Sequence, residues 1–144
     1  MAEATGRVLR ASLRAKLYRD IEIGSGRSLY DLAEGIISAF GFDFDHAFGF
    51  YSKLTGRYTD APVRYELFAD MADADRAARS VKRSTVAQAF AKIGTKMLFL
   101  YDYGDEWRFT VELIALTTMP KSRHPQLVAA VGKAPPQYPD MDEE

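Results

Sequence analysis

Apolar and polar residues alternate along the first part of the chain. From position 9 to position 17 every odd residue is Leu or Ala, while the even residues are Arg, Ser or Lys. Alternation of this kind is typical of a β-strand with one solvated face, so we expect a strand over residues 7–17. Ile21 and Ile23 continue the apolar pattern through a second short strand, which we expect to end at Gly24.

The next segment has the pattern of an amphipathic helix. Its apolar residues recur at the three- and four-residue spacing of one helix face, at Leu29, Leu32, Ala33, Ile36, Ile37 and Phe40. Ser28 is a typical N-cap residue, Asp31 gives a weaker form of the capping box, and Gly41 is a typical helix end. We therefore expect the principal helix of the fold over residues 29–40.

The middle of the chain predicts further strands, a loop and a short helix. The aromatic-rich residues 42–51 are typical of a loop that leads into a third strand, and residues 63–68 predict a fourth. Residues 69–83 are small and charged without apolar periodicity, so we expect an exposed loop there. Thr85 begins a capping-box pattern, which predicts a short second helix as far as Ile93.

The stretch from Met97 to Leu113 predicts a β-hairpin around a turn at Gly104-Asp105. On its second arm, Trp107 and the alternate apolar residues that follow it share one face, while the residues between them are polar. On the first arm both faces are apolar or aromatic, which is typical of a central strand.

Together these elements predict the α+β class. We expect a single domain over residues 1–132, with a mainly antiparallel or mixed sheet packed against one principal helix and a short second helix. Residues 133–144 are acidic and rich in proline. We expect them to form an extended or disordered tail.

Net charge gives little indication of the protein's partner. The chain has 144 residues and a net charge of −1. The tail contains one lysine against four acidic residues and so carries −3, which leaves +2 on the remainder. That balance is too weak to indicate nucleic-acid binding by itself.

Several classes of protein are excluded or disfavoured. The sequence has no cysteine and two histidines, which excludes disulfides, thiolate metal sites, a thiol nucleophile and imidazole-rich metal clusters. No apolar run is long enough to span a membrane, and residues 1–5 lack the basic and apolar regions of a secretory signal. We therefore expect a cytoplasmic protein with no membrane partner.

The turn of the predicted hairpin resembles a known family. Leu100-Tyr-Asp-Tyr-Gly-Asp-Glu-Trp107 is similar to the aromatic-Asp-aromatic-Gly-Asp-x-Trp pattern of the plasmid pRiA4b ORF-three-like family. Other segments resemble that family in the same order along the chain, namely residues 17–23, residues 28–44, and Asp45-His46 with Phe48.

The resemblance covers residues 7–138 and contains one departure. Many members have a histidine two residues after the tryptophan, where this chain has Phe109, so a mechanism that needs that imidazole is not expected here. Residues 134–139 resemble a proline-rich ending found in part of the family. The resemblance implies an α+β fold and an association with plasmids and insertion elements, but no settled activity.

The hairpin tip is the first candidate binding region. Its residues are Asp102, Tyr103, Asp105, Glu106 and Trp107, and His46 lies on another predicted loop. Large aromatic residues often anchor interfaces, whereas Asp and Gly are also ordinary turn residues. A lone histidine beside aromatic residues is more often structural than functional.

An alternative use of the same region is metal binding. If the loops meet, Asp45, Asp102, Asp105 and Glu106 would offer the oxygen ligands that Mg²⁺ or Mn²⁺ prefers. Metal-bound water would then act as the nucleophile of a hydrolase or nuclease. Turn formation accounts for the same carboxylates without a metal.

Basic residues form a second candidate region. One set, Arg76, Arg79, Lys82 and Arg83, lies in the predicted loop, and another, Arg10, Arg14, Lys16 and Arg19, lies on the predicted strands. Either set could neutralise nucleic-acid phosphates, and either could equally be a solvated surface.

The sequence therefore favours a small, non-enzymatic binding module, without a cofactor, whose partner is protein or nucleic acid. It would be accessory to mobile-element or nucleic-acid processes. The alternative is a divalent-metal-dependent hydrolase or nuclease with an acidic site at the hairpin tip.

Overall fold

A computed structural model of the chain describes residues 5–70 and 78–138. Its strands are β1 (Gly6–Arg14), β2 (Leu17–Gly24), β3 (Phe48–Tyr51), β4 (Arg64–Glu66), β5 (Arg79–Ser80), β6 (Lys96–Tyr101), β7 (Trp107–Thr117) and β8 (Gln126–Val131). Its helices are α1 (Leu29–Ala39) and α2 (Val86–Ala89), with 3-10 turns η1 (Tyr58–Asp60) and η2 (Leu67–Asp70).

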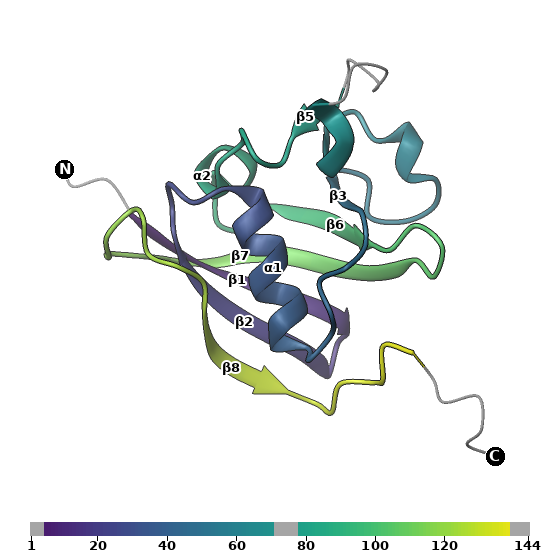
Figure 1. The fold of residues 1–144 in the computed structure, drawn as a ribbon. Helices are drawn as coiled ribbons and strands as arrows, with labels where there is room; N and C mark the ends of the chain where they lie inside the picture. Colours follow the sequence, from purple (N-terminus) through teal and green to yellow (C-terminus); the bar gives the residue numbers. More distant parts are fainter. Residues whose placement is uncertain (1–4, 71–77, 139–144) are drawn as a thin grey trace.

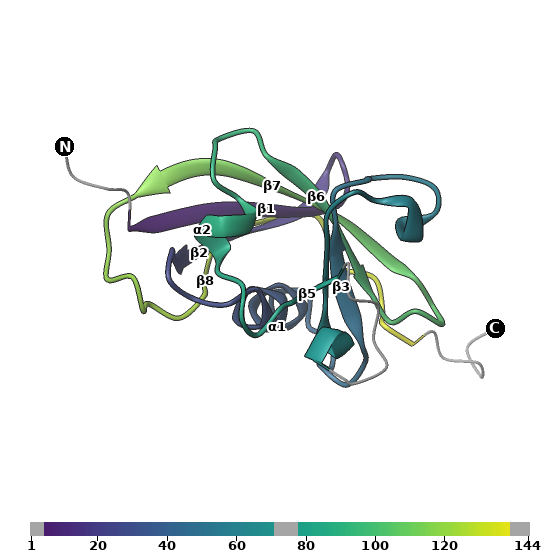
Figure 2. The same ribbon diagram turned by 90° about the horizontal axis from the view of Figure 1, so that it is seen from above.

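Within the described residues, eight strands form one sheet in the order β5-β4-β3-β6-β7-β1-β2-β8 (Figure 1). The pair β4–β5 is parallel and the other neighbouring pairs are antiparallel. Helix α1 lies against one face of this sheet (Figure 2). The expected α+β class, with a mixed and mostly antiparallel sheet, a principal helix and a short second helix, is confirmed.

The local helix signals are confirmed. The Ser28 side chain accepts a hydrogen bond from the Asp31 backbone N–H at 3.1 Å, which begins α1. Gly41 follows the helix with a φ of +75°, a conformation that glycine adopts without steric strain. At α2, Thr85 and Gln88 form both hydrogen bonds of the capping box.

The core lies between α1 and the sheet. Phe50, Phe99 and Phe109 are fully buried there, and the Phe50 and Phe99 rings stack at 4.7 Å between centroids. Strand β6 pairs with β3 on one side and β7 on the other, so the expected central strand is confirmed. Its alternate residues Leu98 and Leu100 belong to a smaller apolar cluster on the opposite face of the sheet.

Two expected boundaries are wrong. The first strand ends at Arg14 and the chain turns before Leu17 begins β2, because alternation continues through a tight turn and does not mark it. Helix α2 ends at Ala89 rather than near Ile93. Phe90 leaves the helical conformation, with φ −123° and ψ 67°, and is fully buried.

The expectation of an exposed loop over residues 69–83 is wrong in part: Arg79, Lys82 and Arg83 are exposed, but their neighbours in the described residues are not. Residues 79–80 form β5, and Val81 is fully buried in the core. The Val81 backbone N–H donates to the Glu66 carbonyl at 3.3 Å, and its carbonyl accepts from the Tyr30 N–H at 3.1 Å. These partners are distant in sequence, which is why local pattern did not indicate burial.

Strand β8 has no counterpart among the expected elements. It is an edge strand beside β2, and most of its residues are exposed, so its sequence shows no alternation. Beyond it, residues 133–138 form no helix or strand, and Gln137 is buried against Asp43. The expected domain boundary at residue 132 stays a prediction.

Candidate functional site

The hairpin tip is organised by the carboxylate of Asp102. Its Oδ1 accepts from the backbone N–H groups of Gly104 at 3.0 Å and Asp105 at 3.3 Å. Asp102 and Glu106 have φ values of 65° and 52°, in the left-handed region that few residues other than glycine adopt. Because Asp102 is buried and caps the turn, its carboxylate has a structural role in this tip.

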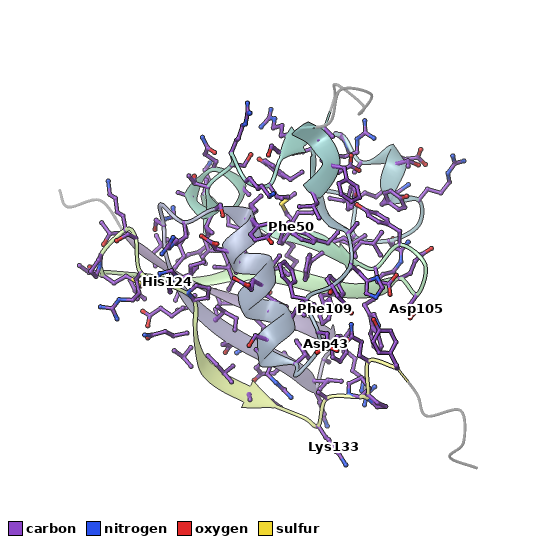
Figure 3. All side chains as sticks on the ribbon, in the orientation of Figure 1. Asp43, Phe50, Asp105, Phe109, His124 and Lys133 are labelled. Atoms are coloured by element: carbon purple, nitrogen blue, oxygen red, sulfur yellow. The ribbon has the colours of Figure 1, made fainter. Side chains whose placement is uncertain are left out.

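His46 lies beside this turn and close to two carboxylates. Its Nε2 is 3.4 Å from Asp45 Oδ1 and 3.5 Å from Asp102 Oδ2, and it is hydrogen-bonded to the Tyr138 hydroxyl. The structure therefore brings His46, Asp45 and Asp102 together, as expected if the loops meet. Figure 3 places His124 on the opposite side of the molecule from Asp105.

The Tyr101 hydroxyl fixes the loop that carries His46. It accepts from the backbone N–H groups of Asp45 at 2.7 Å and His46 at 3.1 Å, and donates to the Asp43 carbonyl at 2.5 Å. Burial raises the pKa of Tyr101, so the hydroxyl keeps its proton at neutral pH. These hydrogen bonds give the loop around His46 a structural explanation.

The remaining hairpin residues do not join that group. Asp105 is exposed, and the Glu106 carboxylate pairs with Arg108 at 3.0 Å. Trp107 packs against Phe42 with ring centroids 4.8 Å apart, and Tyr103 is hydrogen-bonded to Tyr51 at 2.7 Å. Across residues 5–70 and 78–138, no group of three or more His, Asp or Glu side chains is arranged to hold a metal ion.

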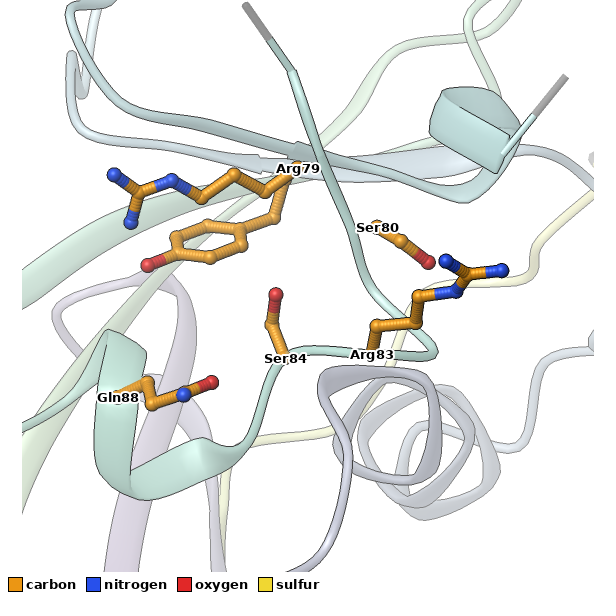
Figure 4. Close-up of a pocket in the computed structure, with 6 residues that line it drawn as sticks. Arg79, Ser80, Arg83, Ser84 and Gln88 are labelled. Atoms are coloured by element: carbon orange, nitrogen blue, oxygen red, sulfur yellow. The ribbon is translucent and has the colours of Figure 1, made fainter. Parts of the chain in front are cut away.

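The second candidate region forms a pocket of about 420 Å³ (Figure 4). Its lining residues are Tyr65, Arg79, Ser80, Arg83, Ser84 and Gln88. Of the expected basic residues, Arg79 and Arg83 line the pocket, and Lys82 lies outside it with its Nζ 5.3 Å from the Tyr30 ring centroid. Arg76 lies outside the described residues.

The pocket has a fixed backbone. Tyr65 on β4 pairs with Arg79 on β5, and the Arg79 guanidinium lies 5.8 Å from the Tyr65 ring centroid. The Ser84 carbonyl accepts from the Leu29 N–H at 2.9 Å, which ties the segment to the start of α1. Gln88 Oε1 accepts from the Thr85 N–H at 2.9 Å, so its amide group is the donor that can meet a ligand.

Sequence reasoning missed Tyr65, Ser80, Ser84 and Gln88 as pocket residues. Little in the sequence indicated that these residues share a pocket, because serines beside arginines are common and β5 could not be recognised from its sequence. Guanidinium, hydroxyl and amide groups line the pocket, and donors of these types suit an anion. In Figure 4 the Arg79 and Arg83 guanidinium groups lie on opposite sides of the pocket, so they suit an extended anion better than a single clamped phosphate.

The basic residues on the strands differ from the pocket set because two of them bind groups of the fold itself. Arg10 pairs with Asp20 at 2.8 Å, and that hydrogen bond raises the pKa of Arg10. Arg19 is buried and donates to the Ala39 carbonyl at 3.2 Å. These two guanidinium groups are thus engaged within the fold, whereas Arg14 and Lys16 of the same set are exposed.

Comparisons with known proteins support the family and the fold. The model of the plasmid pRiA4b ORF-3-like protein family matches residues 7–140. A solved structure of MM3350, a protein of unknown function from Methanosarcina mazei Go1, is similar with a TM-score of 0.68. It is 18% identical, over 92% of this chain and 72% of that chain, so the likeness concerns the fold alone. No match is found among curated proteins.

Helix length sets one further limit. Among the helices of the described residues, none is long and apolar enough to cross a membrane.

Proposed function

The chain belongs to the plasmid pRiA4b ORF-3-like family, and because that family has no settled activity we propose from the chain's own residues that it is a non-enzymatic nucleic-acid-binding module. The proposed contact is between the phosphate backbone and the pocket of Arg79 and Arg83. The observation that carries this proposal is the grouping of guanidinium, hydroxyl and amide donors around one cavity. Such donors supply most protein contacts to nucleic-acid phosphates.

The backbone bonds that hold the pocket segment support the proposal. Ser80 and Ser84 are buried residues on a segment held by β4 and by the start of α1. A backbone that is already ordered loses little further conformational entropy when a ligand binds, whereas the exposed Arg79 and Arg83 side chains still lose rotamer freedom. A nucleic acid would therefore meet a preformed site rather than a disordered basic loop.

The spacing of the charges supports a polymeric ligand. Arg79 and Arg83 face opposite sides of the pocket, and Lys82 adds a third positive charge on the adjoining surface. Successive phosphates of one strand suit this arrangement because each can meet a different cation. Contacts of this kind fix the position of a nucleic acid and carry no base specificity. An accessory role in mobile-element processes is part of the proposal and rests on the family's plasmid description by analogy.

The test is fluorescence anisotropy of labelled single- and double-stranded oligonucleotides titrated with the full chain. Three phosphate contacts predict a slope of log K against log salt concentration of about −2.1 for single strands and about −2.7 for double strands. Affinity should thus fall about 20- to 40-fold between roughly 50 and 200 mM salt. Replacing Arg79, Lys82 and Arg83 together with Ala should remove most of the binding and flatten this slope.

A charge-matched control separates the pocket from general electrostatics. Lys92, Lys96 and Lys133 are exposed cations outside the pocket, and replacing all three with Ala changes the net charge equally. This variant should keep the affinity of the wild type. Equal losses in both triple variants, or no salt-sensitive binding at low salt, would contradict the proposal. Arg79→Lys keeps the charge but loses the guanidinium fork, and we expect an intermediate affinity.

A further inference from the structure

Aromatic side chains and one carboxylate line a small cavity on the face of the sheet opposite α1. Its lining residues are Tyr58, Glu66, Phe68 and Tyr103. The volume is about 180 Å³, below the roughly 300–1,000 Å³ of pockets for drug-sized ligands. The cavity therefore suits a group the size of a side-chain end.

A chain of hydroxyl groups holds the Glu66 carboxylate. The Tyr51 hydroxyl donates to Glu66 Oε2 at 2.6 Å and lies 2.7 Å from the Tyr103 hydroxyl. Since the proton of Tyr51 is directed to Glu66, Tyr103 donates to Tyr51. Burial raises the pKa of both tyrosines, which keeps this chain protonated at neutral pH.

The aromatic rings stand close together around this carboxylate. The Tyr58 ring centroid is 4.9 Å from that of Tyr51 and 5.4 Å from that of Tyr103. Phe68 lines the cavity and is 54% exposed, which is high for a large apolar residue. The faces of such rings carry negative charge density and attract cations.

Gly49 makes the arrangement possible. Gly49 pairs with Glu66 across β3 and β4, and the Tyr51 ring folds back over it. A Cβ atom at position 49 would meet the Tyr51 hydroxyl oxygen at 2.6 Å, closer than real Cβ contacts. Without a side chain at this position, Tyr51 can reach the carboxylate.

The Glu66 carboxylate accepts a hydrogen bond from a neutral group, the Tyr51 hydroxyl. On the adjoining loops, Lys53 is 3.6 Å from Asp60 and Arg108 is 3.0 Å from Glu106, so each of these cations has its own carboxylate.

We propose that this cavity binds an organic ammonium group between its aromatic rings and the Glu66 carboxylate. The group is the trimethylammonium of a choline-like molecule or the side-chain ammonium of a lysine in a partner. Rings supply cation–π attraction, and the carboxylate supplies the opposite charge. The site is independent of the proposed nucleic-acid contact, because Glu66 and Tyr65 point to opposite faces of β4.

The test is an NMR titration of the ¹⁵N-labelled full chain with choline chloride. Saturable shifts are expected at the amides of Glu66, Phe68 and Tyr103, with weak, millimolar affinity. The neutral isostere 3,3-dimethylbutan-1-ol should bind at least about fivefold more weakly, because it has the shape without the charge. Potassium chloride serves as the salt control and should give no saturable shift.

Variants locate the site. Glu66→Gln keeps a hydrogen-bond acceptor for Tyr51 but removes the charge, and should raise the Kd of choline about fivefold or more. Phe68→Leu changes an exposed residue and should raise it about two- to fivefold. Glu34→Gln removes an exposed carboxylate on α1 and should leave the Kd unchanged.

A peptide arm distinguishes the two sources of the cation. Acetyl-Gly-Lys-Gly-amide binding more tightly than choline at the same amides would support a lysine-bearing partner, and the reverse order a choline-like molecule. Equal binding of choline and its neutral isostere would overturn the proposal. So would unchanged affinity in Glu66→Gln and Phe68→Leu, or the absence of saturable shifts with every cation tested.

Discussion

Phe109 occupies the position where the family resemblance leads one to expect a histidine, and Phe109→His tests what the position does. Phe109 is fully buried, and its ring lies 5.0 Å from Phe40 and 5.5 Å from Phe99 between centroids. Both of these rings are apolar and offer an imidazole no hydrogen bond. We therefore expect the substitution to destabilise the protein rather than to create a functional group.

The size of the effect follows from two losses. Removing a fully buried Phe side chain forfeits about 1.5–3 kcal/mol of transfer free energy. A neutral imidazole brings one donor and one acceptor, and each costs about 1–3 kcal/mol when buried without a partner. Together these losses predict that the free energy of unfolding falls by about 3.5–9 kcal/mol at pH 8. Phe109→Leu keeps the site apolar and should lose only about 1–2 kcal/mol.

Proton linkage gives the same variant a second, independent signal. Burial disfavours the charged imidazolium, so the folded-state pKa of the new histidine lies below its unfolded value of about 6.5. The unfolded state then binds more protons at low pH, and stability falls as pH drops below that value. At pH 5.5 the additional loss should be about 1.4 kcal/mol relative to pH 8, beyond any change in wild type.

Urea denaturation of wild type, Phe109→His and Phe109→Leu at both pH values measures these quantities. A Phe109→His protein as stable as wild type would refute the argument. Greater relative stability at pH 5.5 would also refute it, because a protonated imidazole would then have a partner in the fold.

Two further predictions concern the hairpin tip. Tyr101→Phe removes the hydroxyl that binds the backbone around Asp45. We expect the free energy of unfolding, measured by urea denaturation, to fall by about 1–3 kcal/mol. An unchanged value would mean that solvent replaces the hydroxyl. Millimolar Mn²⁺ should leave the melting temperature unchanged in wild type and in Asp102→Asn, since the described carboxylates form no metal ligand set. A Mn²⁺-dependent rise that Asp102→Asn abolishes would restore the metalloenzyme alternative.

Features set by neighbours along the chain were predictable from the sequence. The caps at Ser28 and Thr85 depend on contacts three residues away, so their patterns identified both helix starts. Strand β6 was recognisable as central because residues on both of its faces are apolar. The family resemblance at the hairpin was also confirmed by the family match.

Features set by distant contacts were not predictable. The burial of Val81 depends on backbone bonds to Glu66 and Tyr30, which no local pattern encodes. Strand β8 is exposed on both faces, so the alternation that reveals other strands is missing. The role of Asp102 was ambiguous in sequence, because a turn carboxylate and a metal ligand have the same residue type.

The short strand β4 shows why candidate sites were harder to predict than elements. Its residues Tyr65 and Glu66 are adjacent in sequence but point to opposite faces of the sheet. Tyr65 meets Arg79 from β5 in a pocket of donors, while Glu66 meets Tyr51 from β3 in a cavity of aromatic rings. The strand was visible in the sequence, whereas the opposite chemistry of its two faces arises from which distant elements each face contacts.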